Sequence, residues 1–113
     1  MRNSVNVLGT EYTIDYMSEN DNELLKGCDG YCDWTSHHIV IEKEMIGNLE
    51  DMDAYCRKVL RHEIVHAFAI ESGLHECSHS TESWANNEEM VDWLARLGQK
   101  IYKAWEEAGA LDV

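Results

Sequence analysis

Apolar and polar residues alternate through the first part of the chain, as they do in half-buried β-strands. The apolar positions of this pattern are Val5, Val7, Tyr12, Ile14 and Tyr16. Gly9 and Thr10 interrupt the alternation, so residues 4–17 predict a β-hairpin. Residues 31–34 predict a short further strand, and the β-branched run at residues 38–42 predicts a stronger one.

The second part of the chain changes to helical spacing. From about residue 49 to residue 72 there is no proline or glycine, and one apolar stripe contains Leu60, Ile64, Ala67 and Phe68. Gly73 is a natural helix stop, and residues 74–83 predict a polar loop. A second helix then extends to about Ala108, with one apolar face at Met90, Leu94, Leu97, Ile101 and Trp105. A small antiparallel or mixed sheet followed by two long helices predicts an α+β fold, with residues 1–113 forming a single domain.

The first predicted helix contains His62-Glu63-Ile64-Val65-His66, a match to the pattern H-E-x-x-H. Residues four apart on a helix lie on the same face, so both imidazoles can reach one zinc ion. Glu63 is offset from the pair, where it can take a proton from zinc-bound water and pass it to a leaving amine. We therefore predict that His62 and His66 bind Zn²⁺ and that Glu63 is the catalytic general base.

A catalytic zinc ion normally has three protein ligands and one open position. The longer pattern that ends in a third histidine fails, because Ala69 and Ser72 stand where it needs Gly and His. The remaining candidates are His75, His79, Glu82, Glu88 and Glu89. Glu88 is preferred because it projects nearer the apolar face of the second helix. Glu89 is the close alternative, although Asn86 and Glu89 could form a capping box.

Asp92 follows Glu88 by one helical turn and shares its face. An acid at that position can accept a hydrogen bond from the far nitrogen of a ligand histidine and fix its tautomer. The alternative is that the acids form a solvated helix N-terminus, where negative charge is favourable.

The chain is strongly acidic, with 9 Lys and Arg against 22 Asp and Glu and a formal net charge of −13. Because this charge repels phosphate backbones and anionic lipids, neither a nucleic acid nor a membrane is expected as a partner. We find no apolar run of membrane-spanning length and no secretory signal, so we expect a cytoplasmic protein with reduced cysteines. A Cys28–Cys32 disulfide stays open as an alternative, and so does a second zinc site formed with Cys77 and His79.

The segments that carry these motifs resemble small metallopeptidase-like proteins of phages and prophages. These proteins look like minimal gluzincins and are similar, at longer range, to the ImmA/IrrE-type metallopeptidases. The resemblance is carried by residues 61–68, 71–74 and 87–95. The family pattern, H-E-x-x-H on one helix and E-x-x-x-D on the next, implies zinc ligands His62, His66 and Glu88, with Glu63 as base and Asp92 behind a ligand histidine. It also implies a zincin-like core and zinc-dependent hydrolysis of peptide bonds.

In such enzymes an edge strand lies over the zinc and pairs with an extended peptide or protein substrate. The resemblance nominates residues 36–43 for this strand, and an ordinary sheet strand is the alternative. Of His37 and His38 at most one can approach the site, because neighbouring strand residues point to opposite faces. Candidate donors to a tetrahedral oxyanion are His75, His79 and Tyr102. A non-catalytic, zinc-stabilised phage or prophage interaction protein is the alternative function, and a metal-free acidic binding module is a third.

Overall fold

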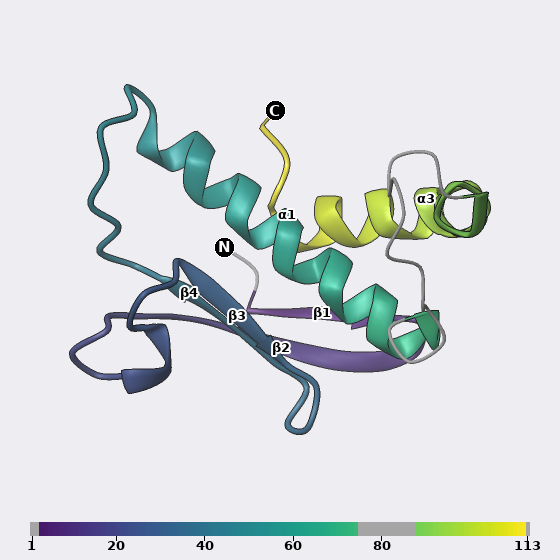
Figure 1. Ribbon diagram of the computed structural model, residues 1–113, viewed down its shortest axis with the longest axis horizontal. Helices are drawn as coiled ribbons and strands as arrows, with labels where there is room; N and C mark the ends of the chain where they lie inside the picture. The colour runs from purple at the N-terminus through teal and green to yellow at the C-terminus, as the bar shows by residue number, and fades with distance from the viewer. Residues whose placement is uncertain (1–2, 75–87, 113) are drawn as a thin grey trace.

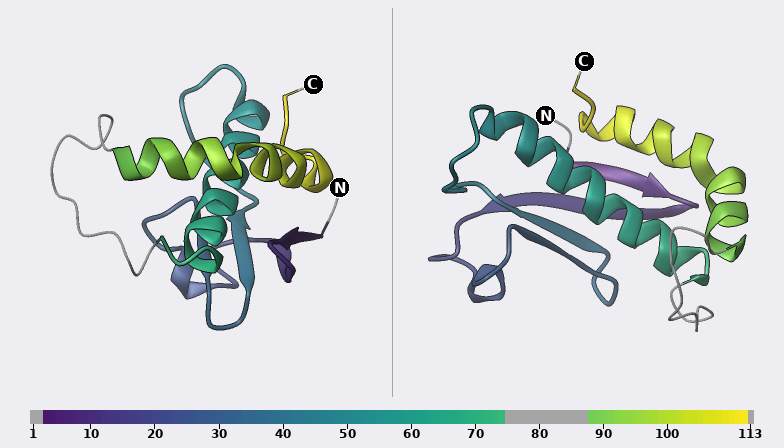
Figure 2. Two further views of the ribbon diagram at one scale, coloured as in Figure 1. Left: turned by 90° about the vertical axis from the view of Figure 1, so that its right-hand side faces the viewer. Right: turned by 45° about the horizontal axis from the view of Figure 1, so that its top comes forward.

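Four strands and two long helices form the part of the chain that the computed structural model describes, residues 3–74 and 88–112. The elements are β1 (Ser4–Val7), β2 (Thr10–Met17), the short 3-10 helix η1 (Glu23–Leu25), β3 (Gly30–Asp33), β4 (His38–Glu42), α1 (Met52–Glu71) and α3 (Glu88–Ala108). Both long helices lie on the same side of the sheet (Figure 1 and Figure 2). The fold is α+β, as the predicted order of strands and helices indicates.

The predicted hairpin is confirmed, since β1 and β2 pair antiparallel from Ser4 opposite Thr13 to Val7 opposite Thr10. The two residues of the turn, Leu8 and Gly9, have φ angles of 51° and 95°. A two-residue hairpin turn commonly needs positive φ at both positions, which glycine adopts freely and leucine does not.

The sheet is mixed and has the strand order β1-β2-β4-β3. Strand β4 pairs parallel with β2 on one side and antiparallel with β3 on the other. The expectation that residues 36–43 supply an edge strand is therefore wrong, and β3 forms that edge instead. The physical reason lies in β4 itself, where Ile39, Val40 and Ile41 are all 0 % exposed. An uninterrupted apolar run of this kind suits an interior strand better than an edge.

Helix α1 packs across the sheet with the stripe that the sequence predicts, since Leu60, Ile64, Ala67 and Phe68 are all buried. The side chain of Asp51 caps its first turn by accepting a hydrogen bond from the Ala54 amide at 3.0 Å. Gly73 follows its last residues with a φ of +84°, the left-handed conformation typical of a helix end. The carboxylate of Glu71 accepts a hydrogen bond of 2.8 Å from the Tyr12 hydroxyl, which fastens the end of α1 to β2.

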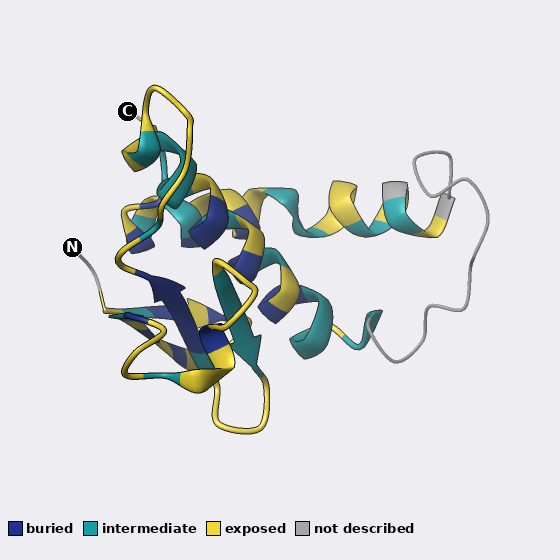
Figure 3. Cartoon of the chain, turned by 60° about the vertical axis from the view of Figure 1, so that its left-hand side comes forward, coloured by how far each residue is buried: buried dark blue, intermediate teal, exposed yellow. Residues whose placement is uncertain are grey.

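Helix α3 is buried mainly in its second half, where Ile101, Ala104 and Ala108 belong to the core. The prediction that Leu94 faces the core is wrong, because Leu94 is 50 % exposed. The first half of α3 reaches away from the sheet (Figure 3), although Trp93 and Leu97 in this half are partly buried against the core. Trp93 in this half donates its indole N–H to the hydroxyl of Ser72, the residue after α1, at 2.8 Å. Among the helices of residues 3–74 and 88–112, none is long and apolar enough to cross a membrane.

Candidate metal centre

The two histidines of the H-E-x-x-H segment converge at the surface of α1. His62 and His66 are both exposed, and their Nε2 atoms lie 3.1 Å apart. Two nitrogen ligands at tetrahedral angles on one zinc ion, with Zn–N bonds of about 2.0–2.1 Å, would stand about 3.3 Å from each other. In the structure the contact is a hydrogen bond between the two rings, and its length is close to the separation of two ligands on one zinc ion. Helical spacing predicts this convergence, whereas zinc binding itself stays a prediction.

A surface hollow of about 400 Å³ lies over this pair. One wall comes from α1 and the other comes from β3 and the residues that follow it. The lining residues are Gly30, Tyr31, Cys32, Trp34, His62, Glu63, His66 and Ile70. The sheet edge beside the two histidines is thus β3, which the sequence reasoning did not connect with the site.

Glu63 lies between the exposed histidines and the buried stripe of α1. Its side chain is only 6 % exposed. Burial raises the pKa of its carboxyl from 4.5 to about 7, because a charged carboxylate is poorly solvated there. A carboxyl whose pKa lies close to neutrality suits a group that must both accept and donate a proton.

The third ligand stays a prediction. Glu88 is the first residue of α3, but its side chain lies outside the described part of the structure, as do His75, His79 and Glu82. The alternative, Glu89, is exposed. Among the side chains that the structure describes, which leave out Glu88, no third His, Cys, Asp or Glu completes a metal-binding group with the histidine pair.

Asp92 forms an ion pair along α3, and the role that the resemblance implies for it stays a prediction. Its Oδ2 accepts a hydrogen bond from Nε of Arg96 at 2.9 Å, and the two side chains are 66 % and 78 % exposed. Leu94, in the same half of α3, is also exposed, and this half of the helix reaches away from the sheet (Figure 3).

Three other candidates do not reach the hollow. His37 packs edge-on against the ring of Tyr12, with centroids 5.3 Å apart. His38 pairs with Asp15, Nε2 to Oδ2, at 2.6 Å. Neither of these histidines lines the hollow, nor does Tyr102, which is 53 % exposed on α3.

Two residues of the hollow were missed by sequence reasoning, Cys32 and Trp34. Burial, with added repulsion from the charge of Glu63, raises the pKa of the Cys32 thiol to about 12. Trp34 is 57 % exposed directly beside the histidines. A tryptophan that follows a short predicted strand can be seen in the sequence. Only the sheet order shows that it borders the hollow at the histidines.

The cysteines that the structure describes are free thiols, namely Cys28, Cys32 and Cys56. The open alternative of a Cys28–Cys32 disulfide is therefore not what the structure contains. Cys77 and His79, the other members of the alternative second zinc site, lie outside the described residues.

Comparisons of the chain with protein-family models, with curated proteins and with solved structures find no match. The function of the protein is therefore inferred mainly from the geometry of the site around His62 and His66.

Proposed function

We propose that the protein is a zinc-dependent metallopeptidase in which His62 and His66 bind the metal and Glu63 is the general base. The observation that carries the proposal is the 3.1 Å separation of the two Nε2 atoms. Two lone pairs can then converge on one cation, as tetrahedral zinc requires. The resemblance of the motifs to small phage and prophage metallopeptidases agrees with this assignment.

A bound zinc ion would supply acidity to a water molecule and would polarise a peptide carbonyl. Glu63 would take the proton of the attacking water on its carboxylate and then donate that proton to the leaving amine. Its burial helps both steps, because the raised pKa keeps the two protonation states close in free energy. Glu88 is the proposed third ligand, with Glu89 as the alternative.

The proposed substrate is a peptide or protein segment in extended conformation, bound along β3. This strand pairs with β4 on one side and, in the described sheet, has no strand on the other. Its residues Gly30 to Cys32 line the hollow at the histidines. An extended peptide could hydrogen-bond to that edge while Trp34 contacts one of its side chains.

We also propose that the protein works in the cytoplasm. Its described cysteines are free thiols, which suit a reducing compartment.

The first test is the zinc content of protein purified without a histidine tag and without chelators. We expect about one zinc ion per chain by mass spectrometry, and near loss of zinc in His62→Ala and His66→Ala. His38→Ala is the matched control, because His38 pairs with Asp15 away from the hollow and should keep the metal. Zinc bound equally well by all three variants would contradict the assignment.

A pair of isosteric variants tests the third ligand in the same assay. Glu88→Gln should lose zinc affinity, and Glu89→Gln should keep it. The reverse result would assign the third position to Glu89.

The second test asks whether the zinc site is catalytic. A peptide library of mixed sequence is incubated with wild-type protein and with Glu63→Gln, and new termini are counted by mass spectrometry. Glu63→Gln should keep its zinc and lose cleavage by a factor on the order of 10² or more. Equal cleavage by the variant would refute the mechanism, and zinc without cleavage in the wild type would favour the zinc-stabilised interaction protein.

A further inference from the structure

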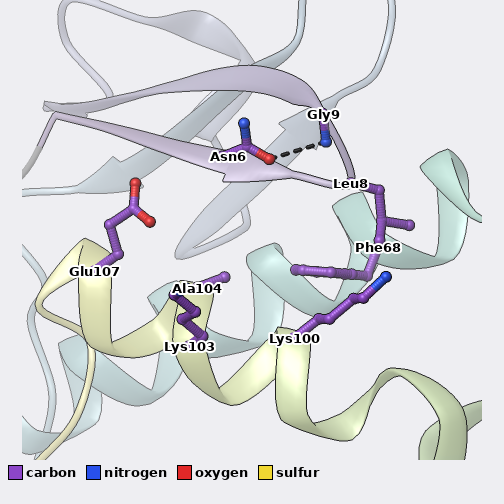
Figure 4. A pocket seen from close by; sticks show the side chains of 8 residues that line it. All are labelled: Asn6, Leu8, Gly9, Phe68, Lys100, Lys103, Ala104 and Glu107. Carbon is purple, nitrogen blue, oxygen red and sulfur yellow. Dashed lines mark hydrogen bonds between the residues drawn. The ribbon is translucent and has the colours of Figure 1, made fainter.

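A second hollow, of about 520 Å³, lies between the turn of the β1–β2 hairpin and helix α3 (Figure 4). It shares no lining residue with the hollow at the histidines. The residues that line it are Asn6, Leu8, Gly9, Phe68, Lys100, Lys103, Ala104 and Glu107. Its volume lies within the range of about 300–1,000 Å³ that is usual for small-molecule sites.

Two lysines give this hollow a positive wall in a chain of net charge −13. Lys100 and Lys103 lie about one turn apart on α3, so they share a face. The basic side chains for which the structure shows ion pairs are those of Lys26, His38, Arg57, Arg61 and Arg96. Within the described chain, neither lysine of the hollow has such a partner. Glu107 lies at the opposite end of the hollow from Leu8 and Phe68, and the ammonium group of Lys100 lies on the side of Phe68 (Figure 4).

The apolar part of the hollow contains a residue that its own backbone disfavours. Leu8 has a φ of 51° and is 37 % exposed, although Asn or Gly suits this turn position better. Its side chain borders the hollow beside Phe68 and Ala104, which are 1 % and 3 % exposed. Strained backbone conformations are found most often at functional sites, where the strained residue serves binding or catalysis.

We propose that this hollow binds an amphiphilic carboxylate, a small molecule with an acid group at one end and a short aliphatic chain. The carboxylate would lie between the ammonium groups of Lys100 and Lys103. The chain would cover Leu8, which is 37 % exposed, and so remove the main exposed apolar surface of the hollow from water. Neither part alone supplies much affinity, because exposed ion pairs are weak and the apolar area is small. The proposal does not depend on the zinc site.

Octanoate is the probe, titrated into the full chain and followed by the amide signals in NMR spectra. We expect saturable shifts at Leu8, Gly9 and the segment 100–107. Acetate tests the charge alone and 1-octanol tests the aliphatic chain alone, and each should bind at least about tenfold more weakly. The absence of saturable octanoate binding, shifts centred elsewhere, or equal binding of acetate would overturn the proposal.

Three variants sharpen the test. Lys100→Gln combined with Lys103→Gln should weaken octanoate binding about tenfold, whereas Lys26→Gln, a lysine paired with Glu23, should leave it unchanged. Leu8→Asn should weaken binding while raising the melting temperature by a few degrees, because asparagine tolerates positive φ. This opposite movement separates a binding role from a loss of folding. Wild-type affinity in the double lysine variant, or an equal loss in Lys26→Gln, would refute the assignment.

Discussion

Ile64 and Phe68 on one side of α1 are 0 % and 1 % exposed and pack in the core, whereas His62 and His66 on another side are exposed beside β3. The two sides belong to the same helix, but they face different surroundings and carry different kinds of side chain. The buried side contributes apolar contacts to the core. The exposed side carries polar groups that stay in contact with water. Glu63 lies between the two sides and is 6 % exposed. Burial of its carboxyl lowers the stability of the charged form, whereas the proposed chemistry uses that carboxyl.

The largest expected effect is on the buried side. Ile64→Ala should lower the free energy of unfolding by about 2–5 kcal/mol, because it removes apolar burial and leaves a cavity. The exposed variant His62→Ala, measured without zinc, should change it by less than about 0.5 kcal/mol. Urea unfolding of both variants at one pH measures the difference. A similar loss in both would mean that the two sides of α1 do not differ as the burial indicates.

Zinc should stabilise the protein through the exposed side alone. At a free concentration of about 100 times its dissociation constant, a ligand of the native state adds about 2.7 kcal/mol. The melting temperature of the wild type should therefore rise with zinc, and that of His66→Ala should not. Ile64→Ala serves as the control, since it should melt lower but keep its response to zinc. A full response in His66→Ala would contradict the metal assignment.

Glu63 should cost the metal-free protein stability at neutral pH. Its pKa is raised from 4.5 to about 7 in the folded state, so its contribution is most favourable below pH 4.5 and is lost as the pH rises to 7. Glu63→Gln, which does not titrate, should be more stable than the wild type above pH 7 by roughly 3 kcal/mol. The two proteins should converge below pH 4.5. Denaturant unfolding with chelator across this range measures the curve, and a parallel offset at every pH would refute the explanation.

The smallest effect is expected at Asp92. Because Asp92 and Arg96 form an exposed pair, Asp92→Asn should change the free energy of unfolding by less than about 0.5 kcal/mol. The zinc affinity should also stay the same. The metallopeptidase resemblance implies instead that Asp92 supports a ligand histidine, whose loss of support would weaken zinc binding about 10–100-fold. Zinc titration of the variant distinguishes these two roles.

Most elements of the fold could be predicted from local sequence signals. The alternation of residues 4–17, the turn at Gly9 and the stop at Gly73 each act over a few residues, and the structure confirms them. The convergence of His62 and His66 was predictable for the same reason. Cys32 and Trp34 were not connected with the site, because their place depends on which strand pairs with β4.

The expectations that failed are the ones that depend on packing between distant segments. Residues 36–43 were expected to form an edge strand, yet the pairing of β4 with residues 13–17 places β4 inside the sheet. Leu94 was expected in the core, yet no part of the sheet lies under the first half of α3. Helical and strand periods specify which residues share a face, but they do not specify what that face meets.

The sequence by itself determined the helix, its buried stripe and the pair of imidazoles, because the helical repeat places residues three and four apart on one face whatever the rest of the chain does. Only the tertiary structure decided that β3 borders those imidazoles, that Glu63 is buried beside them, and that Leu8, Lys100 and Lys103 line one second hollow. These relations join residues far apart in the chain. They arise from strand order and helix packing, which depend on the apolar surface that the whole chain buries.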